Sequence, residues 1–144
     1  MTQVNPYITF NGNCREIMNF YKECLGGELI IQNVADSPIA AQCPSAMQDK
    51  VLHSSLLLNN NLLFMASDMI PPDGYLHGNN LSLSLNCSSE EEINNFYGKL
   101  SDGGKIIDPL KKQFWGALFG VFDDKYGIRW MLNYHSGQEE NKTN

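Results

Sequence analysis

The sequence predicts an α+β fold made of two similar modules, each with the element order β-α-β-β-β. The main observation is an internal repeat, because IMNFY at residues 17–21 recurs as INNFY at residues 93–97. The same offset of 76 residues aligns three further identities: Gly27 with Gly103, Ile30 with Ile106, and Ile31 with Ile107. Two copies are too few for a solenoid, which needs about three repeats, so they fit a closed pair of modules.

Composition agrees with a globular domain and argues against two classes of partner. The chain has 144 residues, of which 42% are hydrophobic and 18% charged, as is typical of one folded domain. Its net charge of −6 and its scattered basic residues argue against nucleic acid, which needs clustered lysine and arginine. No signal peptide and no apolar run of about 18 residues is visible. We therefore expect a cytoplasmic protein that does not bind membranes.

The cysteines give no sign of a metal or redox site. None of the four shows CxxC spacing, which favours reduced, structural residues: Cys14, Cys24, Cys43 and Cys87.

The first module begins with a strand, a helix and a second strand. Residues 6–10 form a short β-rich run, and residues 14–25 place apolar side chains at helical spacing before a Gly-Gly pair ends the helix. Residues 28–34 indicate the second strand. Residues 35–50 contain two prolines and no periodicity, so we expect a long loop, which in a compact domain is often functional or mobile.

A hairpin and a linker complete the first module. The predicted strands 51–58 and 62–67 flank three asparagines, which tolerate positive φ and therefore signal a tight turn. Residues 69–79 contain repeated proline and glycine and separate the two modules. We place the modules at about residues 5–68 and 79–134.

The second module repeats this order. Residues 81–85 alternate leucine and serine, which indicates a half-buried strand. Two serines and three glutamates at residues 88–92 begin a helix that continues to Leu100. A second Gly-Gly pair ends this helix, and a strand starts at Lys105.

The chain closes with another hairpin, formed by residues 117–122 and 128–132. Its turn contains Asp123 and Asp124, and we assign both to the turn rather than to a pair of catalytic carboxylates. The polar residues 136–144 are expected to form a disordered tail.

Four stretches carry a resemblance to a known family: PYITFNGNCREIMNFYKECLGGE, KVLHSSLLL, LLFMASD and FWGALFGVFDDKYGIRWML. With the helix–GG–KII segment they reach from Pro6 to about Leu132, and they resemble the PhnB-like branch of the vicinal oxygen chelate superfamily. That superfamily includes glyoxalase I, the bleomycin and fosfomycin resistance proteins and extradiol dioxygenases. Some PhnB-like members carry the label 3-demethylubiquinone-9 3-methyltransferase. The resemblance implies a glyoxalase/bleomycin resistance-like fold, in which two curled mixed sheets form an open cup for a ligand.

Chemistry in this superfamily normally depends on a divalent metal held by His and Glu side chains on facing strands. The resemblance maps the four ligand positions onto Pro6 or Tyr7, Met65 or Ser67, Asn80, and Met131. Proline and methionine cannot replace histidine or carboxylate for such an ion. We therefore expect no metal and no cofactor.

Two polar residues remain as candidate catalytic residues. His53 shares one strand face with Ser55, and it is either a structural histidine or a general base. Asp68 ends the neighbouring strand, where it either orients a histidine, contacts a ligand or caps a turn.

Aromatic and polarisable residues are candidates for contacts with a ligand between the two sheets. Phe114, Trp115 and Tyr7 would provide aromatic walls unless they pack in the core. Strand alternation puts Trp130 and Met131 on opposite faces, so Trp130 belongs to core or dimer packing if Met131 lines the cavity. The predicted ligand-binding residues are Tyr7, Met65, Trp115 and Met131.

Functions from different classes remain open. The first is binding of a small organic molecule in an aromatic cup without the usual metal. The second is an enzyme of lyase, isomerase or transferase type, with His53 as general base assisted by Asp68. A metal-dependent enzyme like glyoxalase or a dioxygenase is a further alternative. No strand–Gly-rich loop–helix motif for a nucleotide cofactor is visible.

Two expectations concern packing. Phe20 and Phe96 should be buried, because each lies on the apolar side of its predicted helix. The chain should form a homodimer, because short curled sheets leave exposed strand edges and the superfamily resemblance implies dimers.

Overall fold

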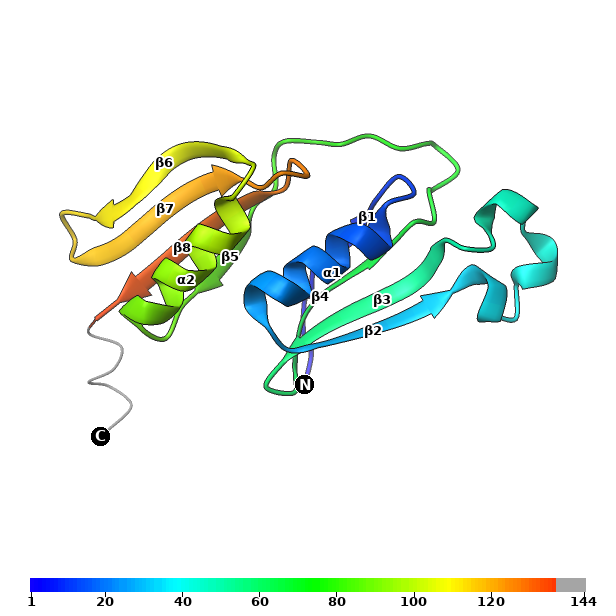
Figure 1. Ribbon diagram of the computed structural model, residues 1–144, viewed down its shortest axis with the longest axis horizontal. Coiled ribbons are helices and arrows are strands. Elements are labelled where there is room, and N and C mark those ends of the chain that lie inside the picture. Colours follow the sequence, from blue (N-terminus) through cyan, green and yellow to red (C-terminus); the bar gives the residue numbers. More distant parts are fainter. Residues whose placement is uncertain (137–144) are drawn as a thin grey trace. The chain divides into compact units, whose positions relative to one another are not determined.

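The computed structural model describes residues 1–136, and the chain divides between His77 and Gly78 into two compact units (Figure 1). Each unit contains one helix and one four-stranded mixed sheet, so the predicted α+β class with two β-α-β-β-β modules is confirmed. The predicted tail lies, from residue 137 onward, outside the described residues. No helix within the described range 1–136 is long and apolar enough to cross a membrane.

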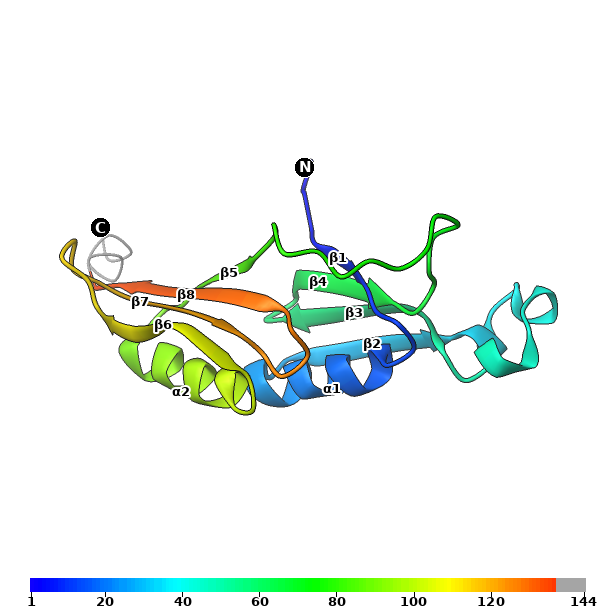
Figure 2. The same cartoon turned by 90° about the horizontal axis from the view of Figure 1, so that it is seen from above.

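The first unit contains strands β1 (Tyr7–Thr9), β2 (Glu28–Asn33), β3 (Val51–Leu58) and β4 (Asn61–Ser67) and helix α1 (Cys14–Leu25). The strand order is β1-β4-β3-β2, with β1 parallel to β4 and the other pairs antiparallel. Helix α1 covers one face of this sheet (Figure 2). The core between them buries side chains from both layers: Ile17, Met18, Tyr21, Leu25, Leu56 and Phe64.

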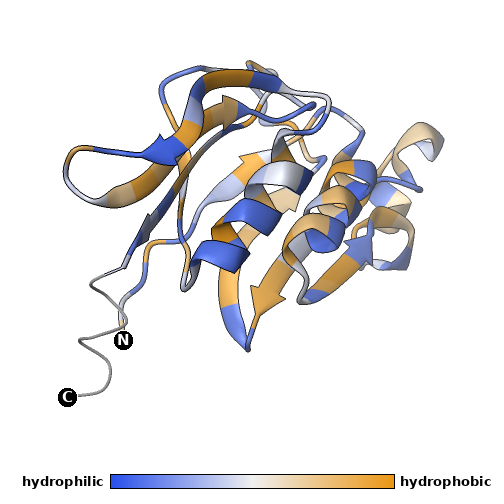
Figure 3. Cartoon of the chain, turned by 60° about the vertical axis from the view of Figure 1, so that its left-hand side comes forward, coloured by the Kyte–Doolittle hydropathy of each residue, from blue (hydrophilic) through white to orange (hydrophobic). Residues whose placement is uncertain are grey.

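The second unit contains strands β5 (Leu83–Asn86), β6 (Lys105–Lys112), β7 (Ala117–Asp123) and β8 (Arg129–His135) and helix α2 (Glu90–Ser101). The strand order β5-β8-β7-β6 repeats the pattern of the first unit, with β5 parallel to β8. Figure 3 shows polar colours on the outer turns of α2 and apolar colours along much of the strands. Its core also comes from helix and sheet: Ile93, Phe96, Leu100, Phe122, Trp130 and Leu132.

The two helices test the internal repeat directly. Each has 12 residues, and the Phe-Tyr pair occupies the same two positions in both, at 20–21 in α1 and at 96–97 in α2. After the helices the offset between equivalent residues of the two units grows by one. Two residues separate α1 from β2, whereas three separate α2 from β6. The helix identities are therefore structurally equivalent, whereas the isoleucine identities in the strands are not.

Burial of the Phe-Tyr pairs differs between the units. Phe96 is buried as predicted, but the prediction for Phe20 is wrong, because Phe20 is only half-buried and its neighbour Tyr21 is fully buried. Tyr21 packs edge-on against Phe64 of β4, with ring centroids 5.5 Å apart. In α1 the tyrosine, rather than the phenylalanine, therefore faces the sheet.

Two local features show why the sequence folds in this way. Asn59 and Asn60 connect β3 to β4 with φ values of 53° and 66°, as in a two-residue type I′ hairpin turn. Gly27 and Gly104 precede β2 and β6, and a Cβ on either would lie 2.1 Å from a backbone carbonyl oxygen. Any larger residue would push the strand away from its neighbour.

One predicted strand needs correction, and one predicted loop has internal structure. The first strand of the second module begins at Leu83, not Leu81, because β8 pairs only with residues 83–86. The predicted loop 35–50 contains three short 3₁₀ turns, Val34–Asp36, Ala40–Gln42 and Ser45–Met47. The Gln48 side chain donates hydrogen bonds to the carbonyls of Ala40 and Cys43, which fixes this loop from within.

Candidate functional site

The sheet of the first unit has one face that does not contact α1, and we call it the open face. Ser54 and Leu56 of β3 are buried on the helix side, so alternation places His53 and Ser55 on the open face. Met65 of β4 is in register with both Ser55 and Tyr7. Three of the predicted site residues, Tyr7, His53 and Met65, therefore share the open face.

A row of three hydrogen-bonded side chains crosses this face. The hydroxyl oxygen of Tyr7 lies 3.0 Å from Nδ1 of His53. Nε2 of the same imidazole lies 3.2 Å from Oγ of Ser55. Tyr7 keeps 50% of its surface exposed, so a ligand can reach the row.

Both partners of His53 are hydroxyl groups, and this has a chemical consequence. A hydroxyl group can donate or accept a hydrogen bond, so the row accommodates either neutral tautomer of the imidazole. It also accommodates the imidazolium, which donates from both nitrogens. His53 can therefore exchange a proton without leaving either ring nitrogen unpaired.

Asp68 is not part of this row. Its Oδ1 accepts hydrogen bonds from the main-chain N–H groups of Gly12 and Cys14, and its Oδ2 accepts one from Val51, all at 3.0 Å. The residue is 2% exposed, and its partners lie at the start of α1 and β3. The structure therefore does not bring Asp68 to His53, and the carboxylate connects the helix to the sheet.

The corresponding face of the second sheet carries Met131. Met131 lies between Ser84 of β5 and Val121 of β7 in the strand register. Its neighbour Trp130 is buried on the α2 side, which agrees with the alternation expected from the sequence. Met131 is therefore a candidate ligand contact within its own unit, whereas Trp130 belongs to the core.

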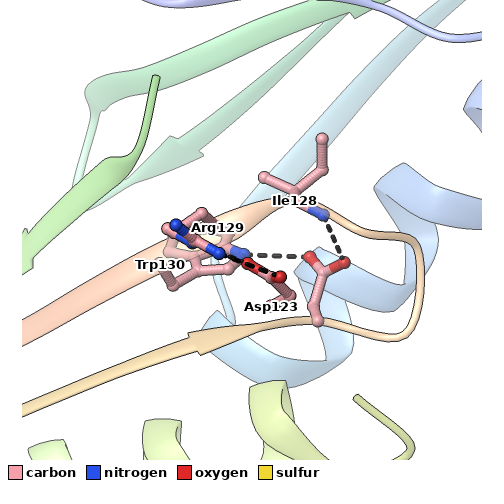
Figure 4. Close-up of polar contacts among 5 residues, drawn as sticks. Asp123, Ile128, Arg129 and Trp130 are labelled. Atoms are coloured by element: carbon pink, nitrogen blue, oxygen red, sulfur yellow. Dashed lines mark hydrogen bonds and ion pairs between the residues drawn. The ribbon is translucent and has the colours of Figure 1, made fainter. Parts of the chain in front are cut away.

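Asp123 and Asp124 have structural partners. Figure 4 shows the side chain of Asp123 paired with Arg129, whose Nε donates to Oδ1 over 2.8 Å. Asp124 is buried and accepts hydrogen bonds from the main chain of Tyr126 and Ile128 and from the indole of Trp130. The assignment of Asp124 to the turn is confirmed, whereas that of Asp123 is wrong, because Asp123 is the last residue of β7 and pairs with Arg129 of β8.

Trp115 lies in the tight turn between β6 and β7 and is 48% exposed. Its ring packs edge-on against Phe114, at 4.8 Å between centroids, and against Phe119 at 6.1 Å. Phe114 is 97% exposed. This aromatic cluster stands at the end of a hairpin and is available for an apolar contact.

The residues at the mapped metal positions do not fit a divalent ion. The register pairs Tyr7 with Met65 and Ser84 with Met131. Asn80 lies before β5, and Ser84 of β5 occupies the position beside Met131. Phenol, thioether and hydroxyl groups do not form the nitrogen and carboxylate set that such an ion prefers. Within residues 1–136 no three His, Cys, Asp or Glu side chains gather as a metal site.

Ser55 is the functional candidate that sequence reasoning did not assign. The only signal for it is the spacing of two residues from His53, which puts both on one strand face. The contact between Tyr7 and His53 has no local signal in the sequence. The two residues are 46 positions apart, and their strands, β1 and β3, lie on either side of β4.

Comparisons with known proteins agree with this fold. A family model described as 3-demethylubiquinone-9 3-methyltransferase matches residues 2–133. Protein YjdN of Escherichia coli (strain K12) is 30% identical over 139 residues, which cover 90% of this chain and 93% of YjdN.

Several solved structures are also similar to this chain. Protein PA1353 from Pseudomonas aeruginosa is 38% identical with a TM-score of 0.81, over 94% of this chain and 98% of that chain. The putative 3-demethylubiquinone-9 3-methyltransferase, PhnB protein, from Bacillus cereus is 27% identical with a TM-score of 0.72, over 92% and 99% of the chains. A glyoxalase/bleomycin resistance protein/dioxygenase family enzyme from Burkholderia phytofirmans PsJN shares the fold at 11% identity, with a TM-score of 0.58 over 91% and 94%.

Proposed function

The chain belongs to the 3-demethylubiquinone-9 3-methyltransferase family, the PhnB-like branch of the vicinal oxygen chelate superfamily, and on that premise we propose that it binds a small organic molecule on the open face of its first sheet. The observation that carries the proposal is the row Tyr7–His53–Ser55, whose two hydrogen bonds span 3.0 and 3.2 Å. This row would orient an oxygen atom of the ligand.

The surroundings of the row define the class of ligand. Its three members form hydrogen bonds with one another and with no charged side chain among the described residues. Met65 and the half-exposed Ile30 flank it in register. Polar hydroxyl groups beside apolar surface suit an uncharged molecule that carries a hydroxyl or carbonyl oxygen, such as a phenol.

The row also supplies what the mapped metal positions do not. In the superfamily a divalent ion polarises the oxygen atoms of the ligand. Neither the pair Tyr7 and Met65 in the first unit nor the pair Ser84 and Met131 in the second is suited to hold that ion. We infer that hydrogen bonds from Tyr7 and Ser55 take over the orientation of the ligand oxygen.

The second unit offers a separate apolar contact surface. Met131 lies on a half-buried strand face, and Trp115 is half-exposed in the aromatic cluster at the β6–β7 turn. We propose both as ligand contacts through dispersion, for which a polarisable thioether and an indole are well suited.

Calorimetric titration with phenol tests the proposal. Replacing His53 with Ala should weaken binding by about 2- to 12-fold, the value of one uncharged hydrogen bond, and Y7F and S55A should each act in the same direction. His77→Ala in the exposed linker is the matched control and should leave the affinity unchanged. Equal affinities for phenol in wild type, H53A and Y7F would rule out the row as the binding element.

A second candidate function rests on the two hydroxyl partners of His53. Because both ring nitrogens stay hydrogen-bonded in every protonation state, His53 can act as a general base, with the proton passing through Tyr7 or Ser55. The methyl transfer named in the family description would need a methyl donor, and the sequence shows no Gly-rich loop for a nucleotide-type donor. The candidate activity is therefore proton abstraction by His53 rather than methyl transfer.

Proton abstraction can be measured without knowing the natural substrate. Hydroxyacetone in D₂O exchanges its carbon-bound protons when a base acts beside its carbonyl, and NMR records the rate. An enzyme of this type should accelerate the exchange in wild type and lose the acceleration in H53A. A rate in wild type equal to that of the H53A variant would leave binding as the function.

A further inference from the structure

A hollow lies away from the open face, beside the first turn of α1. It has a volume of about 410 Å³ and is lined by residues from α1, the end of β2 and the following loop: Arg15, Asn33, Ala35, Gln48 and Asp49. Side-chain alternation along the strands places Asn33 on the face of the sheet that α1 covers, whereas it places His53 on the open face. The hollow is therefore distinct from the Tyr7–His53–Ser55 row.

The loop that forms its wall has no counterpart in the second unit. Residues 34–50 connect β2 to β3, whereas only residues 113–116 connect β6 to β7. Among residues 34–50 only Val34 is fully buried, so the loop adds little to the core. Ordering a loop of this length costs conformational entropy, and two similar modules do not need it for the fold. Its presence in one module indicates a role other than packing.

Arg15 is held in an unusual setting. It lies in the first turn of α1, where a positive charge opposes the helix dipole. Its Nη2 donates to Oδ1 of Asn33 and to the carbonyl oxygen of Asp49, the latter over 3.1 Å. Both acceptors are uncharged, and Arg15 forms no ion pair within residues 1–136. Its remaining N–H groups can bind an oxyanion.

The partners of Arg15 are themselves fixed. The amide nitrogen of Asn33 donates to Oδ2 of Asp36 over 3.2 Å, which leaves Oδ1 of Asn33 directed at Arg15. The side-chain amide of Gln48 donates to the carbonyls of Ala40 and Cys43 over 2.8 and 3.1 Å. The main-chain carbonyl of Gln48 accepts a hydrogen bond from the N–H of Ala35. The guanidinium group and one wall of the hollow are therefore positioned before any ligand arrives.

Asp49 supplies the opposite charge. It is exposed, and its carboxylate has no hydrogen bond or ion pair in the described part of the chain. The hollow thus contains one cation and one anion that do not pair with each other. We propose that it binds a small zwitterion of the α-amino acid class, with the ligand carboxylate on Arg15 and the ligand ammonium on Asp49.

Amide chemical shifts recorded during titrations with glycine, acetate and methylammonium test this proposal. Glycine should move the amide signals of Arg15, Ala35, Gln48 and Asp49 with a millimolar dissociation constant. Acetate and methylammonium, which carry one charge each, should bind at least about tenfold more weakly, because each loses one charge-assisted contact. The single-charge probes therefore separate a zwitterion site from a simple ion site.

Variants provide the second arm of the test. Arg15→Gln and Asp49→Asn should each weaken glycine binding about tenfold or more. Lys22→Gln on the same helix, Asp73→Asn in the linker and H53A should leave it unchanged. The carboxylate of Asp49 has no hydrogen bond or ion pair to lose among the described residues, and D49N keeps the main-chain carbonyl that accepts from Arg15, so D49N remains informative if R15Q does not fold. Acetate binding as tightly as glycine, unchanged binding in D49N, or no shift with any probe would each overturn the proposal.

Discussion

The carboxylate of Asp68 accepts main-chain hydrogen bonds from Gly12, Cys14 and Val51, and so it ties the start of α1 to β3. Helix α1 has no side-chain cap from its own N-cap residue, Asn13. Asp68 therefore supplies, from a distant part of the sequence, the acceptor that a helix N-terminus needs. A negative charge there also complements the helix dipole.

Replacing Asp68 with Asn should lower the free energy of unfolding by about 2–4 kcal/mol, because an amide N–H₂ would face a main-chain N–H group in a buried site. Urea denaturation measures this loss, with Asp73→Asn in the exposed linker as control. Phenol binding by folded D68N should equal that of wild type, because Asp68 has no contact with His53. A stable D68N variant that no longer binds phenol would instead return Asp68 to the binding site.

Cys14 makes stability depend on alkaline pH. Burial raises the pKa of its thiol from 9.0 to about 11, against a smaller opposing effect of the hydrogen bond with Ser54. The contribution of the protonated Cys14 thiol to the stability of the folded state is fully present below pH 9. It is lost as the pH rises through about 11, because the thiol of the unfolded chain ionises at lower pH than the buried thiol.

Cys14→Ala should therefore flatten the decline of the unfolding free energy between pH 9 and pH 11. The measurement is a series of urea denaturation curves for wild type and C14A across that range. Parallel declines for the two proteins would show that the buried thiol does not contribute.

At the scale of elements, the β3–β4 hairpin depends on two residues with positive φ. Asn60→Gly should leave stability unchanged or raise it by up to about 1 kcal/mol, because glycine is preferred at the second position of a type I′ turn. Asn60→Val should lower it by about 1–2 kcal/mol, because a β-branched residue is strained at positive φ. Denaturation midpoints that rank N60V at or above N60G would contradict the turn assignment.

The two helices should respond differently to the same substitution. Phe96→Ala should lower the free energy of unfolding by about 3–5 kcal/mol, the usual cost of removing a buried phenylalanine. Phe20→Ala should cost clearly less, because Phe20 keeps part of its surface in water. Thermal denaturation of both variants checks the order, and a larger loss for F20A would contradict the observed burial.

Elements with local signals could be predicted from the sequence. Helix α1 has both a regular apolar period and a terminal Gly-Gly pair, and its predicted bounds are those of the structure. The start of β5 was wrong because the Leu-Ser alternation runs upstream of the residues that β8 pairs with. Which part of an alternating run becomes a strand is decided by its partner.

The candidate site could be predicted only in part, for the same reason. Strand alternation gave the face of His53, but its contacts with Tyr7 and Ser55 depend on the pairing of β1 with β4. Asp68 lies just past a strand end, where alternation no longer tells which side a carboxylate faces. The hollow beside Arg15 depends on how a loop without periodicity folds, and no local sequence pattern predicts that.

At the scale of the whole molecule, we expect a homodimer. The strands β2 and β6 are sheet edges that carry the exposed side chains of Ile30, Ile106 and Ile107, and exposed apolar edges favour association. Light scattering at micromolar concentration should give twice the mass of one 16.2 kDa chain. A stable monomer under these conditions would contradict the expectation.

The account as a whole centres on metal-independent binding of a small organic molecule by the open face of the first sheet. Amide chemical shifts of chelator-treated protein during a phenol titration test this claim most directly. The account predicts that the signals of Tyr7, His53, Ser55 and Met65 move without added metal, and that zinc or nickel changes neither the affinity nor the set of signals. Shifts that appear only after a divalent ion is added, or that leave these four residues unaffected, would contradict it.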